Sequence, residues 1–470
     1  MKRKPIFVLS AVVVAAAVII PPVFIKPTVQ QHFSAWQEQV NQTPGYALSI
    51  EPEEDGWFRS HYTAKLSYDI SLIDPELAEL TDSEDGLVTV PLQITTAYGP
   101  LFFAGPFGIG AAQATVQVDG ENLPDFIQWD KDTPLYQLEI VRGFGGGFTH
   151  KDQLAAFEAS RSGDNETLIF DGYKGHGTYS SGVLEHDASI DRIELKGDSP
   201  VLIENYTVNS IFHAPLEDLF NGSSYSYSMD AEIERIKLAD LVSIEDIQAS
   251  AHNTLDDSKE LNDTTMTMTT DVMELTDFGK VEDIKLTMAL NHISTEFLRR
   301  YNDAVMNGLM TNDSTMQQSQ LVEFLKNNLA LFLEPKPEFN VTEFTAHYDG
   351  NAFAFGAHSH IEAGENPDVK ALVLGPEAWL PLIKADASLT IDQPLLEAMV
   401  SPFIATQLEP MLSQGHITQE EFDSMLSDAQ QQMIGGLIAE GLLEERDDAY
   451  VSNFLMDKGE MTLNGQSMNL

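Results

Sequence analysis

The chain contains no cysteine and few basic residues. The absence of cysteine excludes disulfides, thiolate catalysis, lipoprotein acylation and cysteine-based zinc or iron–sulfur sites. Its 470 residues include 26 Lys and Arg against 73 Asp and Glu, which gives a formal net charge of −47. Because Lys and Arg neutralise nucleic-acid phosphates, this deficit argues against nucleic-acid binding. It argues equally against a body that lies on anionic lipid.

Recognisable catalytic and cofactor motifs are also missing. Residues 142–147 are rich in glycine but lack the spacing of a dinucleotide fingerprint and the Lys-Ser/Thr of a P-loop. No Gly-x-Ser-x-Gly or Ser-x-x-Lys element stands in a context that suggests acyl transfer. Pairs of carboxylates carry no information among so many acids. We therefore assign no catalytic residue and no cofactor, and expect a non-enzymatic protein.

Three histidines are the best candidates for metal ligands. His358 and His360 are two residues apart on an expected strand, so both side chains face the same way, and His347 lies on the preceding strand. Three imidazoles can bind zinc. Histidines that line a sheet face and bond to solvent or carboxylates explain the spacing more simply, so no metal site is predicted.

One long apolar run opens the chain. Three cations precede residues 5–25, in which Ser10 is the only polar residue. Crossing hydrocarbon takes about 20 apolar residues in a helix, and short flanks rich in Lys and Arg stay cytoplasmic. The run predicts a single transmembrane helix with the body on the far side of the membrane. The alternative is a cleaved signal peptide, with small residues at 15–17, but the length of the run favours an anchor. The predicted anchor residues are Ile6, Phe7, Val8, Leu9, Val12, Val13, Val14, Val18, Ile19 and Ile20.

The remaining chain divides into three segments. Residues 26–45 place apolar side chains at helical spacing and predict a stalk. Residues 46–293 alternate apolar and polar side chains in short runs, clearest at 57–70, and predict an antiparallel β-rich region. In a second run, 88–98, Pro91 indicates an edge or a bulge.

The last segment, residues 294–470, combines helical and strand periods and ends in a predicted β-hairpin. Ser294 is a candidate helix N-cap, and Thr418 with Glu421 three residues later forms a capping box. The predicted fold class is α+β. It consists of an N-terminal transmembrane helix followed by a large, mainly antiparallel β body with long covering helices.

Several short motifs occur in one order along nearly the whole chain. They are Phe58-Arg59-Ser60, Tyr98-Gly99-Pro100, a helix with Tyr301-Asn302, and residues 459–466. With the anchor and stalk, they make the chain resemble the YdgA-like family of gammaproteobacterial envelope proteins of unknown function. The resemblance implies a bacterial inner-membrane protein with a periplasmic body and self-association as a homodimer. It supplies no catalytic residues, and the family's usual His is replaced by Tyr98.

Two classes of function follow from these observations. The first is a non-catalytic scaffold or binder, in which the sheet holds an apolar ligand or an envelope protein partner. Leu101, Phe102 and Phe103 form a candidate apolar contact loop beside the sheet. The second class is an unrecognised envelope hydrolase, motivated only by the abundance of acids and histidines. The missing catalytic constellation favours the first class.

Overall fold

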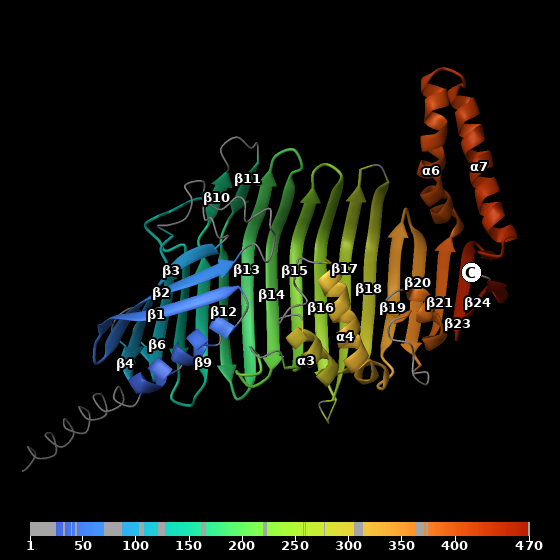
Figure 1. Cartoon of the computed structure of the whole chain (residues 1–470). Coiled ribbons are helices and arrows are strands. Elements are labelled where there is room, and N and C mark those ends of the chain that lie inside the picture. Colours follow the sequence, from blue (N-terminus) through green and yellow to red (C-terminus); the bar gives the residue numbers. More distant parts are fainter. Residues whose placement is uncertain are drawn as a thin grey trace, which may run out of the picture. The chain divides into compact units, whose positions relative to one another are not determined.

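The computed structural model describes residues 25–468, except for 32, 39, 43–44, 70–86, 103–107, 121–126, 161–165, 220–222, 257, 259, 277, 305–313, 363–370 and 373–374. Antiparallel strands dominate it (Figure 1). The chain divides into two compact units. The first comprises residues 1–222 with 302–317, and the second residues 223–301 with 318–470.

The first unit contains fourteen of the strands that the structure describes. Nine of them pair antiparallel in the order β1–β2–β3–β6–β8–β9–β12–β13–β14. Strands β7, β10 and β11 pair with one another in series and join the far end of β13, while β4 pairs with β5. The bounds are β1 Tyr46–Asp55, β2 Arg59–Asp69, β3 Leu87–Tyr98, β4 Leu101–Phe102, β5 Gly108–Ile109, β6 Ala112–Val118, β7 Ile127–Trp129, β8 Tyr136–Arg142, β9 Phe148–Leu154, β10 Phe157–Ser160, β11 Thr167–Phe170, β12 Tyr173–Ser180, β13 Val183–Lys196 and β14 Val201–His213.

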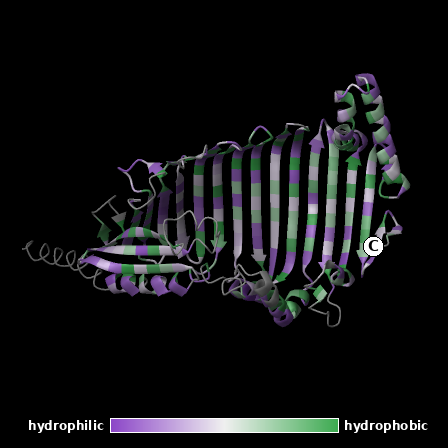
Figure 2. Cartoon of the chain, turned by 45° about the horizontal axis from the view of Figure 1, so that its top comes forward, coloured by the Kyte–Doolittle hydropathy of each residue, from purple (hydrophilic) through white to green (hydrophobic). Residues whose placement is uncertain are grey.

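Alternation of side chains explains why these segments are strands. In β2, Ser60, Tyr62 and Ala64 are buried while the residues between them are more exposed, as the run at 57–70 predicts. Figure 2 shows polar and apolar residues alternating along the strands. Pro91 lies opposite Lys65 of β2, and β6 pairs with β3 only from Gln93 onward. Pro91 therefore sits at an edge, where its missing N–H costs no ladder bond.

The core of the first unit lies between strands β1–β3 and the helical residues at 25–31, 33–38 and 40–42. Leu48, Tyr62, Ala64, Leu92, Ile94 and Val118 are buried together. Phe33 and Val40 of the helical segment pack against this cluster, and the rings of Phe33 and Tyr62 meet edge to face at 5.3 Å. The short helical segment is therefore held by its apolar stripe.

The second unit contains a meander of long strands. Its order is β15–β16–β17–β18–β19–β20–β21–β23, and every neighbouring pair is antiparallel. Strands β22 and β24 pair with β23, and β25 pairs with β24. The bounds are β15 Ser226–Leu238, β16 Val242–Leu255, β17 Leu261–Leu275, β18 Gly279–Ser294, β19 Glu338–Tyr348, β20 Asn351–Ile361, β21 Ile383–Asp392, β22 Glu444–Arg446, β23 Ala449–Asp457, β24 Glu460–Leu463 and β25 Gln466–Met468.

Helices lie beside the strands of the second unit at two places. Helix α3 (Thr295–Ala304) and most of α4 (Ser314–Leu333) lie near one end of β15–β18, whereas α6 (Gln393–Ser413) and α7 (Gln419–Ala439) stand as a pair beyond the ends of β21 and β23 (Figure 1). Two short 3-10 helices, η3 (Pro376–Ala378) and η4 (Leu380–Leu382), precede β21. Ser294 accepts a hydrogen bond from Phe297 N at 3.2 Å, and Thr418 forms the predicted capping box with Glu421. Both predicted N-caps are confirmed.

The predicted α+β class is wrong. Helices are few in the described residues, and each unit is built on a large antiparallel sheet. Helices α6 and α7 do not cover that sheet. Buried residues of α6 and α7 pack with β21 and β23 at their ends, through a cluster of Ile391, Leu395, Ile434, Leu443 and Tyr450. The helical periodicity of the sequence was real, but it marks helices that pack at the end of the strands.

The predicted membrane anchor is also corrected. All ten predicted anchor residues lie outside the described residues, which begin at residue 25. A membrane span takes about 20 apolar residues in one helix, and no helix among the residues described has both that length and that hydropathy. The predictions of a single-pass inner-membrane protein, a periplasmic body and the membrane as a partner are therefore not supported.

Candidate functional site

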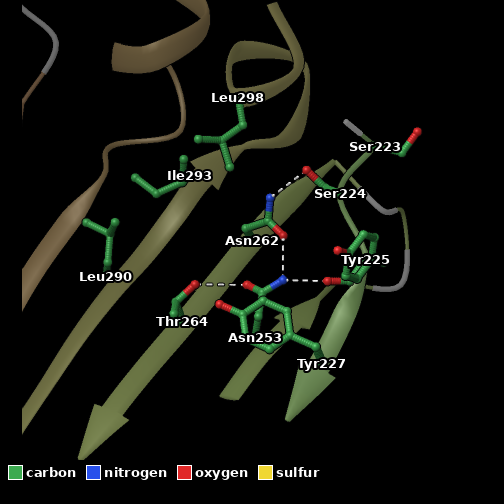
Figure 3. Close-up of a pocket in the computed structure, with 10 residues that line it drawn as sticks. All are labelled: Ser223, Ser224, Tyr225, Tyr227, Asn253, Asn262, Thr264, Leu290, Ile293 and Leu298. Atoms are coloured by element: carbon green, nitrogen blue, oxygen red, sulfur yellow. Dashed lines mark hydrogen bonds between the residues drawn. The ribbon is translucent and has the colours of Figure 1, made fainter. Parts of the chain in front are cut away.

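A pocket opens in the second unit where β15–β18 meet α3 (Figure 3). Its volume is about 330 Å³, within the range of about 300–1,000 Å³ that is usual for ligand pockets. It is lined by Ser223, Ser224, Tyr225, Tyr227, Asn253, Asn262, Thr264, Leu290, Ile293 and Leu298. None of these side chains carries a charge, although the chain is highly acidic. The lining therefore suits a neutral group.

One wall of the pocket is a continuous chain of hydrogen bonds. Asn262 Nδ2 donates to Ser224 Oγ at 3.1 Å, and Asn253 Nδ2 donates to Asn262 Oδ1 at 3.1 Å. Thr264 Oγ1 donates to Asn253 Oδ1 at 2.9 Å. Asn253 Nδ2 also donates to the carbonyl oxygen of Tyr225 at 2.7 Å. Both amides are buried, and these bonds fix their orientation, because each amide offers distinct donor and acceptor ends.

A β-bulge builds the apolar wall. Asn262 lies opposite Ile293 and Thr264 lies opposite Leu290, so three residue steps of β18 face two of β17. Within the bulge His292 has φ +58°, and its backbone N donates to Asp263 Oδ1 at 2.7 Å. Residues three apart in a regular strand point to opposite faces. The bulge lets Leu290 and Ile293 line the same pocket, where Leu298 of α3 joins them.

Two tyrosines complete the lining. The rings of Tyr225 and Tyr227 lie edge to face, with centroids 6.3 Å apart. Burial raises the pKa of Tyr225, and the neighbouring Tyr227 adds to the shift. The Tyr225 hydroxyl therefore stays neutral at physiological pH. The pocket joins neutral polar groups on one side to aliphatic side chains on the other.

The structure separates one of the three candidate metal-binding histidines, His347, from the other two. His358 and His360 are neighbours on β20, with ring centroids 5.7 Å apart. His347 lies on β19 opposite Ala352, six residues along β20 from His358. At about 3.3 Å per residue this is a separation of about 20 Å. His358 lies instead between Glu338 and Asp386, at 3.9 and 3.7 Å, as expected for histidines on a sheet face.

The candidate contact loop is only partly accessible. Leu101 and Phe102 form β4, which pairs with Gly108 and Ile109 of β5. Phe102 is almost fully buried, and Phe103 lies outside the described residues. Leu101 is half-buried. A contact role for this loop stays a prediction, and Leu101 is the residue that could make the contact.

The pocket residues were missed by sequence reasoning. Tyr225 and Tyr227 alternate with serines, which predicts a strand but no site. Asn253 and Asn262 meet only because β16 and β17 pair in one particular register, with Asn253 opposite Thr264. The register of this hairpin is set by the turn between the two strands and by the apolar pattern of both, so neither strand reveals it alone. The one local signal is a pair of asparagines in strands, where Asn is uncommon.

These features define a protein built on antiparallel β-sheet, with a neutral pocket where strands β15–β18 of its second unit meet helix α3. The chain belongs to the bacterial DUF945 family of proteins of unknown function, whose model matches residues 1–470. The prediction that the chain belongs to a bacterial family of unknown function is confirmed. No curated protein and no solved structure matches the chain.

Proposed function

We propose that the second unit binds an amphipathic small molecule, with its polar end in the pocket and its apolar chain along the sheet. The observation that supports this proposal is a half-exposed apolar face that starts at the pocket and continues over β17, β18 and β19. Polar and apolar walls meet in the pocket itself, so its chemistry and that of the face match the two ends of such a molecule.

The apolar face follows from strand register. Residues directly opposite one another in antiparallel strands share a face. One row consists of Met266, Met288 and Val341, and the next of Met268, Leu286 and Phe344. A third row runs from Thr264 through Leu290 to Phe339 and includes two pocket residues. Pocket and apolar rows therefore lie on one side of the sheet.

Several of these side chains are open to solvent. Met266, Met268, Leu290 and Phe339 are 41–48 % exposed. Contiguous exposed apolar side chains are uncommon on soluble domains and mark binding surfaces. Methionine adapts its shape to irregular apolar ligands. On β16, Ala251 and Ala249 lie opposite the two methionines, and their small side chains leave the methionines accessible from that side.

Charge favours a neutral or weakly polar ligand. The chain has 73 acidic residues, which repel nucleic acids and other polyanions, and the ten lining residues carry no charge. Each buried methylene contributes about 0.8 kcal/mol, so an apolar chain along the sheet supplies most of the affinity. Binding of this kind needs no catalytic group.

The test uses the full-length protein and the neutral apolar probe N-phenyl-1-naphthylamine, whose fluorescence rises in an apolar site. Wild type should bind the probe saturably, and Met266→Glu with Met268→Glu should weaken binding at least tenfold. Thr265→Glu is the matched control, because Thr265 is an exposed residue of the same strand that points to the opposite face. Equal binding by the double variant and wild type would overturn the proposal. Organic extraction and mass spectrometry of the purified protein would then identify any natural ligand.

We further propose that, within its family, the chain belongs with the YdgA-like proteins of gammaproteobacteria. The ordered motifs Phe58-Arg59-Ser60, Tyr98-Gly99-Pro100 and residues 459–466 support this placement. A phylogenetic tree of family members in which the chain groups apart from the YdgA-like sequences would contradict it.

A further inference from the structure

Three strands of the first unit bring titratable side chains together on one face of the sheet. His150 and Asp152 lie on β9, and His186 lies on β13, with β12 between them. His150 and His186 both lie opposite Gly177 of β12, and Asp152 lies opposite Gly175. Most flanking positions on the same face are apolar, namely Leu138, Ile140, Leu154, Ala188, Ile190 and Val208. The polar exceptions include Ser210, opposite His186, and Tyr173 on β12.

Two glycines create the space for this cluster. A Cβ atom at Gly177 would come within 2.5 Å of His150 Cε1, and one at Gly175 would come within 2.5 Å of the Tyr173 hydroxyl. The Asp152 carboxylate also occupies the space above Gly175. Glycine weakens a strand interior and marks a close approach by another group. Here the side chains of His150 and Asp152 approach from β9, and the carbonyl oxygen of Glu185 approaches from β13. His186 of β13 meets His150 beside Gly177.

The side-chain atoms converge on one point. His150 Nε2 and His186 Nδ1 are 2.9 Å apart, and the two rings are stacked with centroids 5.1 Å apart. Ligand atoms of His150, Asp152 and His186 all lie within 4.8 Å of one another. The Tyr173 hydroxyl lies 3.4 Å from His186 Nε2, which orients that ring from its other nitrogen.

Two polar atoms of the cluster lack partners. His150 Nδ1 and Asp152 Oδ1 are both buried and have no hydrogen-bond partner in the part of the chain that the structure describes. Buried polar atoms are nearly always satisfied, and exceptions need an explanation. A bound cation would satisfy the carboxylate oxygen. All three residues are nevertheless only half-buried, so an ion can reach them from solvent.

We infer that His150, Asp152 and His186 form a binding site for a divalent transition-metal ion of the zinc class. Two imidazoles and one carboxylate are a ligand set that such ions favour. Two zinc-bound nitrogens at tetrahedral geometry lie about 3.3 Å apart, close to the distance between the two imidazole nitrogens here. Three protein ligands leave a fourth position for water or another ligand.

The experiment uses the full-length protein after treatment with a chelator and dialysis, with excess Mg²⁺ present to occupy exposed carboxylates. Isothermal titration with Zn²⁺ should show one tight equivalent in wild type. Asp152→Asn, which keeps the shape of the side chain, should weaken that binding at least tenfold. His176→Gln is the matched control, because His176 lies between the two glycines but points to the opposite face, 3.5 Å from Asp187.

A second measurement needs no variant. Co²⁺ added to the wild-type protein should develop the visible absorption of a nitrogen- and oxygen-ligated site, and Zn²⁺ should abolish it. Equal zinc affinity in wild type and Asp152→Asn, or a loss of binding only in His176→Gln, would overturn the inference. So would the absence of any cobalt spectrum in the folded wild-type protein, because the two histidines would then form only a hydrogen-bonded pair.

Discussion

Replacing Asn253 with Ala removes three hydrogen bonds from the pocket wall. The lost partners are the carbonyl oxygen of Tyr225, Asn262 Oδ1 and Thr264 Oγ1, at 2.7, 3.1 and 2.9 Å. Each bond contributes about 0.5–1.5 kcal/mol net, and buried groups that lose a partner add to the cost. We therefore expect Asn253→Ala to lower the free energy of unfolding of the second unit by about 2–4 kcal/mol.

The assay must report the second unit alone. Of the four tryptophans, Trp379 belongs to the second unit and the other three to the first. In protein labelled with 5-fluorotryptophan, the ¹⁹F resonance of Trp379 can be followed through a urea titration. Urea midpoints and slopes then yield the unfolding free energy of that unit.

The matched control is Thr254→Ala. Thr254 is the next residue of β16, it is exposed, and its hydroxyl donates a long 3.4 Å bond to the carbonyl oxygen of Asp263. An exposed substitution of this kind changes stability by about 0.5 kcal/mol or less. If Asn253→Ala were no more destabilising than Thr254→Ala, the argument that the buried hydrogen-bonded wall stabilises the second unit would be refuted.

Three further predictions concern the rest of the fold. Ile94→Ala should destabilise the first unit by about 2–5 kcal/mol, because Ile94 is 1 % exposed in its core. The assay is urea unfolding followed at the Trp129 resonance, and a loss below about 1 kcal/mol would contradict the prediction. Hydrogen bonds from Arg299 and Arg300 lower the pKa of Glu296 to about 2 from 4.5. The stability that this carboxylate contributes is complete above pH 4.5 and is lost as the pH falls towards 2. The difference in unfolding free energy between wild type and Glu296→Gln should therefore shrink over that window. A constant difference would refute the lowered pKa of Glu296. Thr418→Ala should cost about 1 kcal/mol and speed amide exchange in the first turn of α7, because the capping box is lost; unchanged exchange would argue against it.

Local patterns predicted the strands well. The alternation at 57–70 matches β2, whose buried residues are those of one predicted face. Pro91 lies at a sheet edge, as its missing N–H requires. Both predicted N-caps were correct, because capping depends on residues three apart in the chain. These features are decided by neighbours in sequence.

The packing of the helices, the membrane span and the candidate metal-binding histidines were not predicted correctly from local patterns. The helical periods within residues 294–470 predicted covering helices, but α6 and α7 pack at the strand ends. An apolar stripe shows that one side of a helix is buried, but it does not identify the surface on which the helix packs. The apolar run at 5–25 predicted a membrane span, and no described helix meets that requirement. Of the three histidines singled out from the sequence, His347 lies far from His358 and His360. The candidate metal cluster instead contains His150 and His186, which are 36 residues apart in the chain.

The sequence by itself determined the acidic character of the protein, the absence of thiol chemistry, and the positions of strands such as those at 57–70 and 88–98, because composition and short periodicities are local properties. Only the tertiary structure decided which strands are neighbours and in which register. That register aligns Asn253 with Thr264 in the pocket, and it aligns His150 with His186 across Gly177. Side chains that converge from separate strands depend on the pairing of whole strands, and no single stretch of chain encodes that pairing.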